Sequence, residues 1–153
     1  AVLALSPPGA ADPGPYYDAV AKAAGATPVL AYHWPALSPP GIPLSLLGDL
    51  GVAGCKDSSG DADRLLATRS THDAPLYVGS SALLALAGPL GCAGAILALA
   101  NADPEGCIAA FSGDGGAQLA LAEGHRQAVT DFPRGIKAAT ARRFGTSTVA
   151  RMG

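Results

Sequence analysis

The chain has 153 residues, of which 49% are apolar and 14% are charged, and its formal net charge is −2. This length and apolar content are sufficient for one domain with a sizeable core. The nearly balanced charge excludes a strongly basic or acidic surface, so we expect no nucleic-acid partner and no attraction to an anionic membrane.

Apolar runs alternate with helical patterns along the first two thirds of the chain. The runs are continuously apolar, which is typical of a parallel sheet covered on both faces. Five strand–helix units follow one another, which favours either a small doubly wound sheet or part of an eight-fold barrel. The predicted strands are residues 1–5, 28–32, 52–55, 76–79 and 94–99, and the predicted helices are residues 16–24, 43–50, 61–69 and 80–90.

Beyond Asn101 the pattern becomes wholly helical. We therefore divide the chain into a strand–helix part at residues 1–102, a helical part at 103–144 and a tail at 145–153, which lacks periodicity and is predicted to be disordered. The helices expected in the second part are residues 104–111, 117–129 and 133–144.

The uncharged run at residues 74–102 is long enough to cross a membrane, but proline and glycine residues break it, so we predict strand, helix and strand instead. No signal peptide is visible at residues 1–11. The three cysteines lack metal-ligand or disulfide spacing, so we expect small core residues in a reducing compartment, with no metal site: Cys55, Cys92 and Cys107.

The stretch VAGCKDSSGD, at residues 52–61, contains the strongest candidate for chemistry. The apolar run ends in a polar, glycine-containing turn, so we predict a buried strand with Lys56 at its end. Poor solvation there favours the neutral amine, which can attack a carbonyl carbon and form a Schiff base. The alternative is a lysine whose ammonium group reaches water. Lys22 and Lys137 lie in helical patterns and are expected to be solvated.

Several stretches together carry a resemblance to a known family. VAGCKDSSGD resembles the Schiff-base lysine strand of the dihydrodipicolinate synthase / N-acetylneuraminate lyase family of class I aldolases. Residues 28–35 (PVLAYHWP), 76–80 (LYVGS) and 91–101 (GCAGAILALAN) resemble that family's neighbouring strands, and residues 135–144 resemble its closing helix. The residues KDS at 56–58 and ALAN at 98–101 are most similar to those of the 4-hydroxy-2-oxoglutarate aldolase and keto-deoxy-sugar-acid aldolase branches.

The resemblance implies an α/β fold that is part of a (β/α)8 TIM barrel, with strands four to eight in this chain, followed by a C-terminal helical segment. A complete barrel normally needs about 250 residues, so we expect an incomplete fragment that is not active alone. The family's Gly-Thr/Ser-rich turn, which holds the pyruvate carboxylate, is not found in this sequence. The resemblance further implies a cytoplasmic homo-oligomer, a tetramer or dimer, without a cofactor.

The resemblance also implies roles for individual residues. Lys56 would form an imine with a 2-oxo acid such as pyruvate, in the manner of a carbon–carbon lyase. Tyr32 would shuttle protons to and from the reacting oxygens, although a tyrosine in this place can also be a packed strand-end residue. Ser58 would touch the substrate, or it is a turn or helix-cap residue.

Three further residues map onto strand ends that shape the pyruvate pocket in the family. They are Gly79, Ser80 and Ile96, and each is equally well explained by a turn or by core packing. Asp57 and Asp61 are expected to be turn and helix-start residues rather than acids in catalysis.

Two departures from the family pattern argue against dihydrodipicolinate synthase-type condensation, which stays an alternative. The loop at residues 36–38 has no arginine to hold a second carboxylate, and residues 8–9 are Pro-Gly where those enzymes carry a tyrosine pair. His33 and Trp34 are candidates for contact with the distal half of a substrate, or His33 has no role.

Two other classes of function remain open. One is a non-catalytic half-barrel that acts as a binding or assembly module, because its outer strands would have unpaired edges. The other is a doubly wound domain that binds an anion, which is disfavoured because no GxGxxG or GxxxxGK[ST] turn follows a strand. His72 and His125 lie in polar or helical contexts and are assigned no role.

Overall fold

The structure is a computed structural model that describes residues 1–151. Its centre is a five-stranded sheet in which every neighbouring pair is parallel. The strands lie side by side in chain order, so β1 and β5 form the two edges. They are β1 (Val2–Leu5), β2 (Val29–His33), β3 (Gly54–Asp57), β4 (Leu76–Val78) and β5 (Gly94–Ala95).

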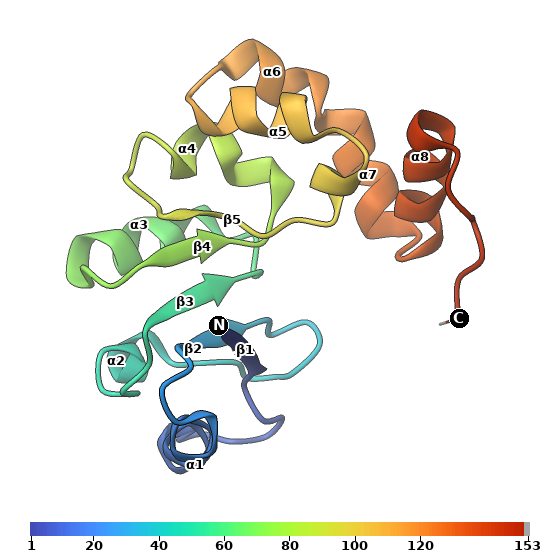
Figure 1. The fold of residues 1–153 in the computed structure, drawn as a ribbon. Helices are drawn as coiled ribbons and strands as arrows, with labels where there is room; N and C mark the ends of the chain where they lie inside the picture. Colours follow the sequence, from blue (N-terminus) through green and yellow to red (C-terminus); the bar gives the residue numbers. More distant parts are fainter. Residues whose placement is uncertain (152–153) are drawn as a thin grey trace.

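A helical connection follows each of the first four strands. Figure 1 shows these helices around the outer side of the curved sheet. Right-handed crossovers place all helices on one face when the strand order never reverses, as in a barrel, whereas a doubly wound sheet needs a reversal. The doubly wound alternative is therefore wrong. The helices are α1 (Gly14–Ala24), α2 (Leu44–Leu47), α3 (Ala62–Thr71) and, after β4, the 3₁₀ helix η1 (Ser81–Leu83) with α4 (Leu84–Ala87).

The C-terminal third is helical, as expected. In Figure 1 it begins above the sheet and continues to the side where the carboxyl ends of β3 and β4 point. Helix α7 packs against η1 and η2, which carries it to that end of the sheet. The elements are η2 (Leu99–Asn101), α5 (Pro104–Phe111), α6 (Gly115–Ala120), α7 (Ala122–Thr130) and α8 (Arg134–Phe144).

Helix α8 ends at Phe144 and is capped by Gly145, whose φ of 67° is the left-handed conformation that favours glycine at a helix end. Residues 145–150 have no regular secondary structure, and residues 152–153 lie outside the described part of the chain. The division into three parts stays a prediction.

The two faces of the sheet differ in burial. Side chains on one face pack beneath the helices and are buried, as Ala31, Cys55 and Leu76 illustrate. The side chains between them, such as Tyr32 and Lys56, are only half-buried. The continuous apolar runs thus coincide with one covered face and one partly open face, rather than two covered faces.

Two strands differ from their predicted bounds by two or more residues, and the others differ by one. Strand β3 continues through Lys56 to Asp57, because both residues pair with β2 on one side and with β4 on the other. Strand β5 stops at Ala95, because it is an edge strand and the ladder to β4 ends where the Ile96 amide donates to the Val78 carbonyl.

Two predicted helices are interrupted. The helix expected at residues 80–90 is split between η1 and α4 at Leu83, which has φ −110° and ψ 8°. The helix expected at 117–129 is split between α6 and α7 at Leu121. Leu65 is buried in α3, but Leu66 beside it is 45% exposed, because only one side of this helix faces the sheet.

All three cysteines are buried and free, which confirms the expectation that they are core residues. Burial raises the pKa of the Cys55 thiol to about 12 and that of Cys107 to about 11. These thiols therefore stay neutral and act as small apolar side chains. Among the described residues, no helix has the length and hydropathy required to cross a bilayer.

We predict that Leu84→Ala lowers the free energy of unfolding by about 2–5 kcal/mol, because the side chain is fully buried where α4 meets α5 and α6. Urea unfolding followed by circular dichroism measures the change. Leu119→Ala is the matched control, since that leucine is 77% exposed and its loss should change stability by less than about 0.5 kcal/mol. Equal losses in both variants would contradict this packing.

Candidate active site

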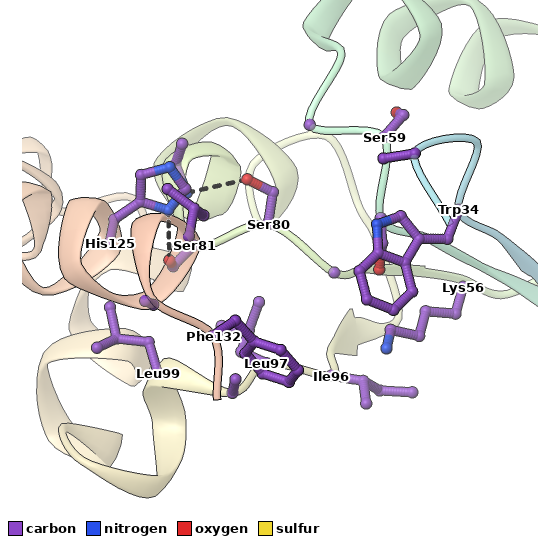
Figure 2. Close-up of a pocket in the computed structure, with 18 of the residues that line it drawn as sticks. Trp34, Lys56, Ser59, Ser80, Ser81, Ile96, Leu97, Leu99, His125 and Phe132 are labelled. Atoms are coloured by element: carbon purple, nitrogen blue, oxygen red, sulfur yellow. Dashed lines mark hydrogen bonds between the residues drawn. The ribbon is translucent and has the colours of Figure 1, made fainter. Parts of the chain in front are cut away.

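A cavity of about 630 Å³ lies at the carboxyl ends of the parallel strands. In open parallel sheets and barrels this end carries the ligand site, because the loops that follow the strands converge there. Figure 2 shows the side chains that line the cavity, from the strand ends to α7. The lining residues include all six of the predicted site residues: Tyr32, Lys56, Ser58, Gly79, Ser80 and Ile96.

Lys56 and Tyr32 are neighbours across the sheet. The register of β2 and β3 pairs their Cα atoms, so both side chains project from the same face. The Lys56 Nζ atom lies 4.1 Å from the centroid of the Tyr32 ring, which is a cation–π contact. The half-buried amine thus lies against the face of the Tyr32 ring, and both residues line the cavity.

Ser58 and Trp34 surround Tyr32. The Ser58 hydroxyl donates a long hydrogen bond of 3.4 Å to the Tyr32 hydroxyl. The Trp34 ring stacks on the Tyr32 ring with 5.8 Å between centroids and 23° between planes. Ser58 does not cap helix α3. Asp61 is the cap, because its carboxylate accepts the Arg64 amide at 3.0 Å. Ser58 is therefore available to the cavity.

The other predicted lining residues combine backbone and packing roles. The Gly79 amide donates to the Asp57 carbonyl at 2.6 Å, which ties the end of β4 to the end of β3. Ser80 caps η1 by accepting the Ala82 amide at 3.3 Å. Ile96 is 38% exposed and supplies an apolar wall near Lys56, as Figure 2 shows.

Asp57 supports the site from the opposite face of β3. Its carboxylate accepts from the Arg64 Nε at 2.8 Å and from the Ser59 amide and hydroxyl at 2.8 and 2.6 Å. Both Asp57 and Arg64 are largely buried, and these bonds compensate their desolvation. Asp57 is therefore a structural residue and not an acid in the cavity, as expected.

His33 does not line the cavity. It is buried, and its Nδ1 accepts the Ile42 amide at 2.9 Å. The Ile42 carbonyl in turn accepts from Arg64 at 2.8 Å, so the loop between β2 and α2 is fastened on both sides of Ile42. Burial lowers the pKa of His33, Asp57 opposes this effect and Arg64 adds to it. His33 is a structural histidine, whereas its neighbour Trp34 does reach the cavity.

The structure adds lining residues that the sequence did not indicate. Ser81 follows the predicted strand end, and His125 and Phe132 come from α7 and the turn after it. Because α7 lies more than 40 residues from β4 in the chain, no local pattern places these side chains near Lys56. Only the packing of α7 against η1 and η2 does so.

We predict that Gly79→Ala lowers the free energy of unfolding by about 1–3 kcal/mol, because a Cβ at this position would collide with the side chain of Ser58. Adding Ser58→Gly should restore part of the loss, since it removes the colliding group. Gly115→Ala, in open space, is the control and should change stability by less than about 0.5 kcal/mol. Failure of the second substitution to restore stability would contradict this contact.

We predict that stability falls as the pH drops below about 6.5, because the unfolded chain then binds a proton that buried His33 excludes. The slope contributed by one such group approaches about 1.4 kcal/mol per pH unit. His33→Asn keeps an acceptor for the Ile42 amide and should flatten the slope between pH 5 and 6.5, measured by urea unfolding. An unchanged slope in His33→Asn would refute the assignment to His33.

Comparisons with known proteins were made for sequence and for structure. No protein-family model matches the chain, and no curated protein matches it. Among solved structures, 94 chains match. A Sulfolobus 2-keto-3-deoxygluconate aldolase in complex with D-KDPG has 17% identity and a TM-score of 0.82, covering 95% of this chain and 55% of its own.

Two dihydrodipicolinate synthases are similarly close in structure. The enzyme from Acinetobacter baumannii, complexed with pyruvate, has 22% identity and a TM-score of 0.79, over 99% of this chain and 62% of its own. The enzyme from Agrobacterium tumefaciens has 23% identity and a TM-score of 0.79, over 92% and 53%.

The chain thus spans little more than half the length of the solved structures that it matches. At this level of identity the likeness establishes the fold. The expected fold, part of a (β/α)8 barrel followed by a C-terminal helical segment, is confirmed: the chain has the fold of the corresponding part of these aldolases and synthases.

Proposed function

We propose that this chain carries the lysine-bearing part of a Schiff-base-forming class I aldolase that acts on a 2-oxo acid. The observation that carries the proposal is the pairing of Lys56 with Tyr32 in one cavity at the carboxyl ends of the strands. An amine and a tyrosine that line one cavity supply the two groups that imine formation requires, the amine as nucleophile and the phenol hydroxyl as proton carrier.

The first half of the reaction joins the substrate to the protein. The Lys56 amine attacks the C2 ketone: a C–N bond forms, the carbonyl π bond breaks, and a proton passes by way of Tyr32 from the nitrogen to the oxygen, which gives a carbinolamine. Tyr32 donates the proton that lets this hydroxyl leave as water, which yields the protonated imine. Ser58 donates to the Tyr32 hydroxyl and keeps it oriented toward the reacting oxygen.

The second half cleaves or forms a carbon–carbon bond. Tyr32, now a base, removes the proton of the C4 hydroxyl, and the electrons of the C3–C4 bond flow to the iminium nitrogen. An aldehyde leaves, and Tyr32 passes the proton it took from the C4 hydroxyl to C3. Attack of water on the resulting iminium ion then releases pyruvate, regenerates the Lys56 amine and returns a proton to Tyr32. The substrate would be of the 4-hydroxy-2-oxoglutarate or 2-keto-3-deoxy acid type.

The solved structures of similar fold support this substrate class. One is named a 2-keto-3-deoxygluconate aldolase and holds D-KDPG, and another is a dihydrodipicolinate synthase complexed with pyruvate. The absence of an arginine in the loop at residues 36–38 favours cleavage of a 2-oxo acid over condensation of the dihydrodipicolinate synthase type.

For the whole protein we propose the assembly and the complete binding site that the family resemblance implies. The intact enzyme would be a cytoplasmic homo-oligomer, and residues outside this chain would complete the binding site for the substrate carboxylate. Light scattering on the protein as expressed in its native host would measure the oligomeric state.

We predict that sodium borohydride traps pyruvate on Lys56. Reduction of the imine adds a fixed mass to one peptide, which intact-protein and peptide mass spectrometry detect. Lys56→Arg should abolish the adduct and leave folding little changed, because charge and bulk are broadly retained. Tyr32→Phe should slow the reaction without preventing the adduct, because the amine is still present.

Lys22→Arg is the matched control, since Lys22 lies exposed on α1, and it should leave trapping intact. An N-terminally extended version of the protein should be tested beside this chain. Absence of an adduct in both proteins would contradict the aldolase proposal. Equal loss of trapping in Tyr32→Phe and Lys56→Arg would contradict the separate roles assigned to these two residues.

The second candidate function is a binding or assembly module. The partly open face of the sheet favours it, because Leu3, at 39% exposure, and Ile96, at 38%, are apolar side chains that a partner could cover. A stable complex formed by a protein that traps no pyruvate would select this function.

A further inference from the structure

The cavity has a second polar group at the end away from Lys56. Figure 2 shows His125 with Ser81 on one side of the cavity and Lys56 on the other, with Leu97 and Phe132 between them. The chemistry derived above uses Lys56, Tyr32 and Ser58 and leaves this histidine without a role.

The position of the His125 ring is set by one hydrogen bond to Ser81, and Gln118 in turn holds the backbone at Ser81. Its Nδ1 lies 2.9 Å from the hydroxyl of Ser81, which is 5% exposed. Gln118 of α6 fixes the helical turn that carries Ser81, because its Nε2 donates to the Ser81 carbonyl and its Oε1 accepts the Ala85 amide, both at 2.9 Å. The imidazole is thus oriented by a built network rather than free on a surface helix.

The charges around the cavity limit what this end can bind. Among the lining residues that the structure describes, Lys56 is the sole lysine or arginine, and none is an aspartate or glutamate. Between the two ends lie the apolar side chains of Leu97 and Phe132. A second carboxylate would find no permanent cation at the far end, and its desolvation would be poorly compensated.

A hydroxyl group fits the remaining ring nitrogen better. With Nδ1 engaged by Ser81, His125 retains Nε2 for another partner, as donor or as acceptor according to the tautomer. A hydroxyl both donates and accepts, so it can pair with either tautomer, whereas a carboxylate only accepts.

From this geometry we infer that His125, oriented by Ser81, binds a hydroxyl group at the distal end of the substrate. The inference rests on the proposed function and narrows it: the preferred substrate is a 2-oxo acid whose far end is hydroxylated, rather than one that ends in a second carboxylate.

Binding of unreactive acids tests the inference without requiring an imine. Gluconate carries distal hydroxyls, adipate a distal carboxylate and hexanoate neither, and all three have six carbons and no ketone. Histidine-ring NMR titrations of the intact chain follow His125, with His33 and His72 as internal references. Gluconate should shift the His125 ring signals and bind more tightly than the other two acids.

His125→Phe should raise the dissociation constant for gluconate about fivefold, the loss of roughly one hydrogen bond, and should leave hexanoate unchanged. Ser81→Ala should change gluconate binding in the same direction by a smaller factor, and it guards against misfolding of the first variant. His72→Phe, at the end of α3 and outside this cavity, is the control and should have no effect.

The outcomes separate this inference from the proposed function. Failure of gluconate to bind, tighter binding of adipate, or unchanged gluconate binding in His125→Phe would overturn the inference even if pyruvate is trapped on Lys56. A gluconate-dependent shift of His125 in a protein that traps no pyruvate would uphold the distal site and remove the aldolase function.

Discussion

The parallel register of β2, β3 and β4 is the constraint on which the site depends. It pairs Tyr32 with Lys56 and Lys56 with Tyr77, so that one row of side chains crosses the partly open face. Because side chains alternate along a strand, a slip of one residue would turn Lys56 into the covered face, where a buried ammonium group would lack partners. The apolar residues on the covered face resist such a slip, and core packing thereby also aligns the reactive groups.

The covered face contributes a polar network as well as apolar packing. Asp57 follows Lys56 in the strand and points to the opposite side, where Arg64 pairs with it. Arg64 and His33 then fasten Ile42, and with it the loop after β2 that begins at Trp34. A buried ion pair is costly to break, since the remaining charge keeps its desolvation penalty. The ion pair therefore keeps the loop after β2 in one arrangement, in which Trp34 stacks on Tyr32.

Prediction from the sequence succeeded where local patterns determine structure. The five strands and most helices lie where apolar periodicity and turn residues indicated, and Asp61 caps α3. Prediction failed at boundaries that depend on neighbours. Strand β3 extends because strands flank it on both sides, and β5 is short because one side has no partner strand. Likewise, the sequence left open whether Ser58 and His33 contact the substrate, because it does not show which polar side chains face the cavity and which are buried elsewhere.

The sequence by itself determined the element types, the position of the single lysine on an apolar strand, and the resemblance that suggested imine chemistry, because these depend on neighbouring residues and short motifs. The tertiary structure alone decided the strand order, the contact of Lys56 with the Tyr32 ring, and the presence of Ser81 and His125 in the same cavity. The two side-chain contacts join residues far apart in the chain: Tyr32 and Lys56 are separated by 24 positions, and Ser81 and His125 by 44. Such contacts arise from the packing of strands and helices, which no local pattern encodes.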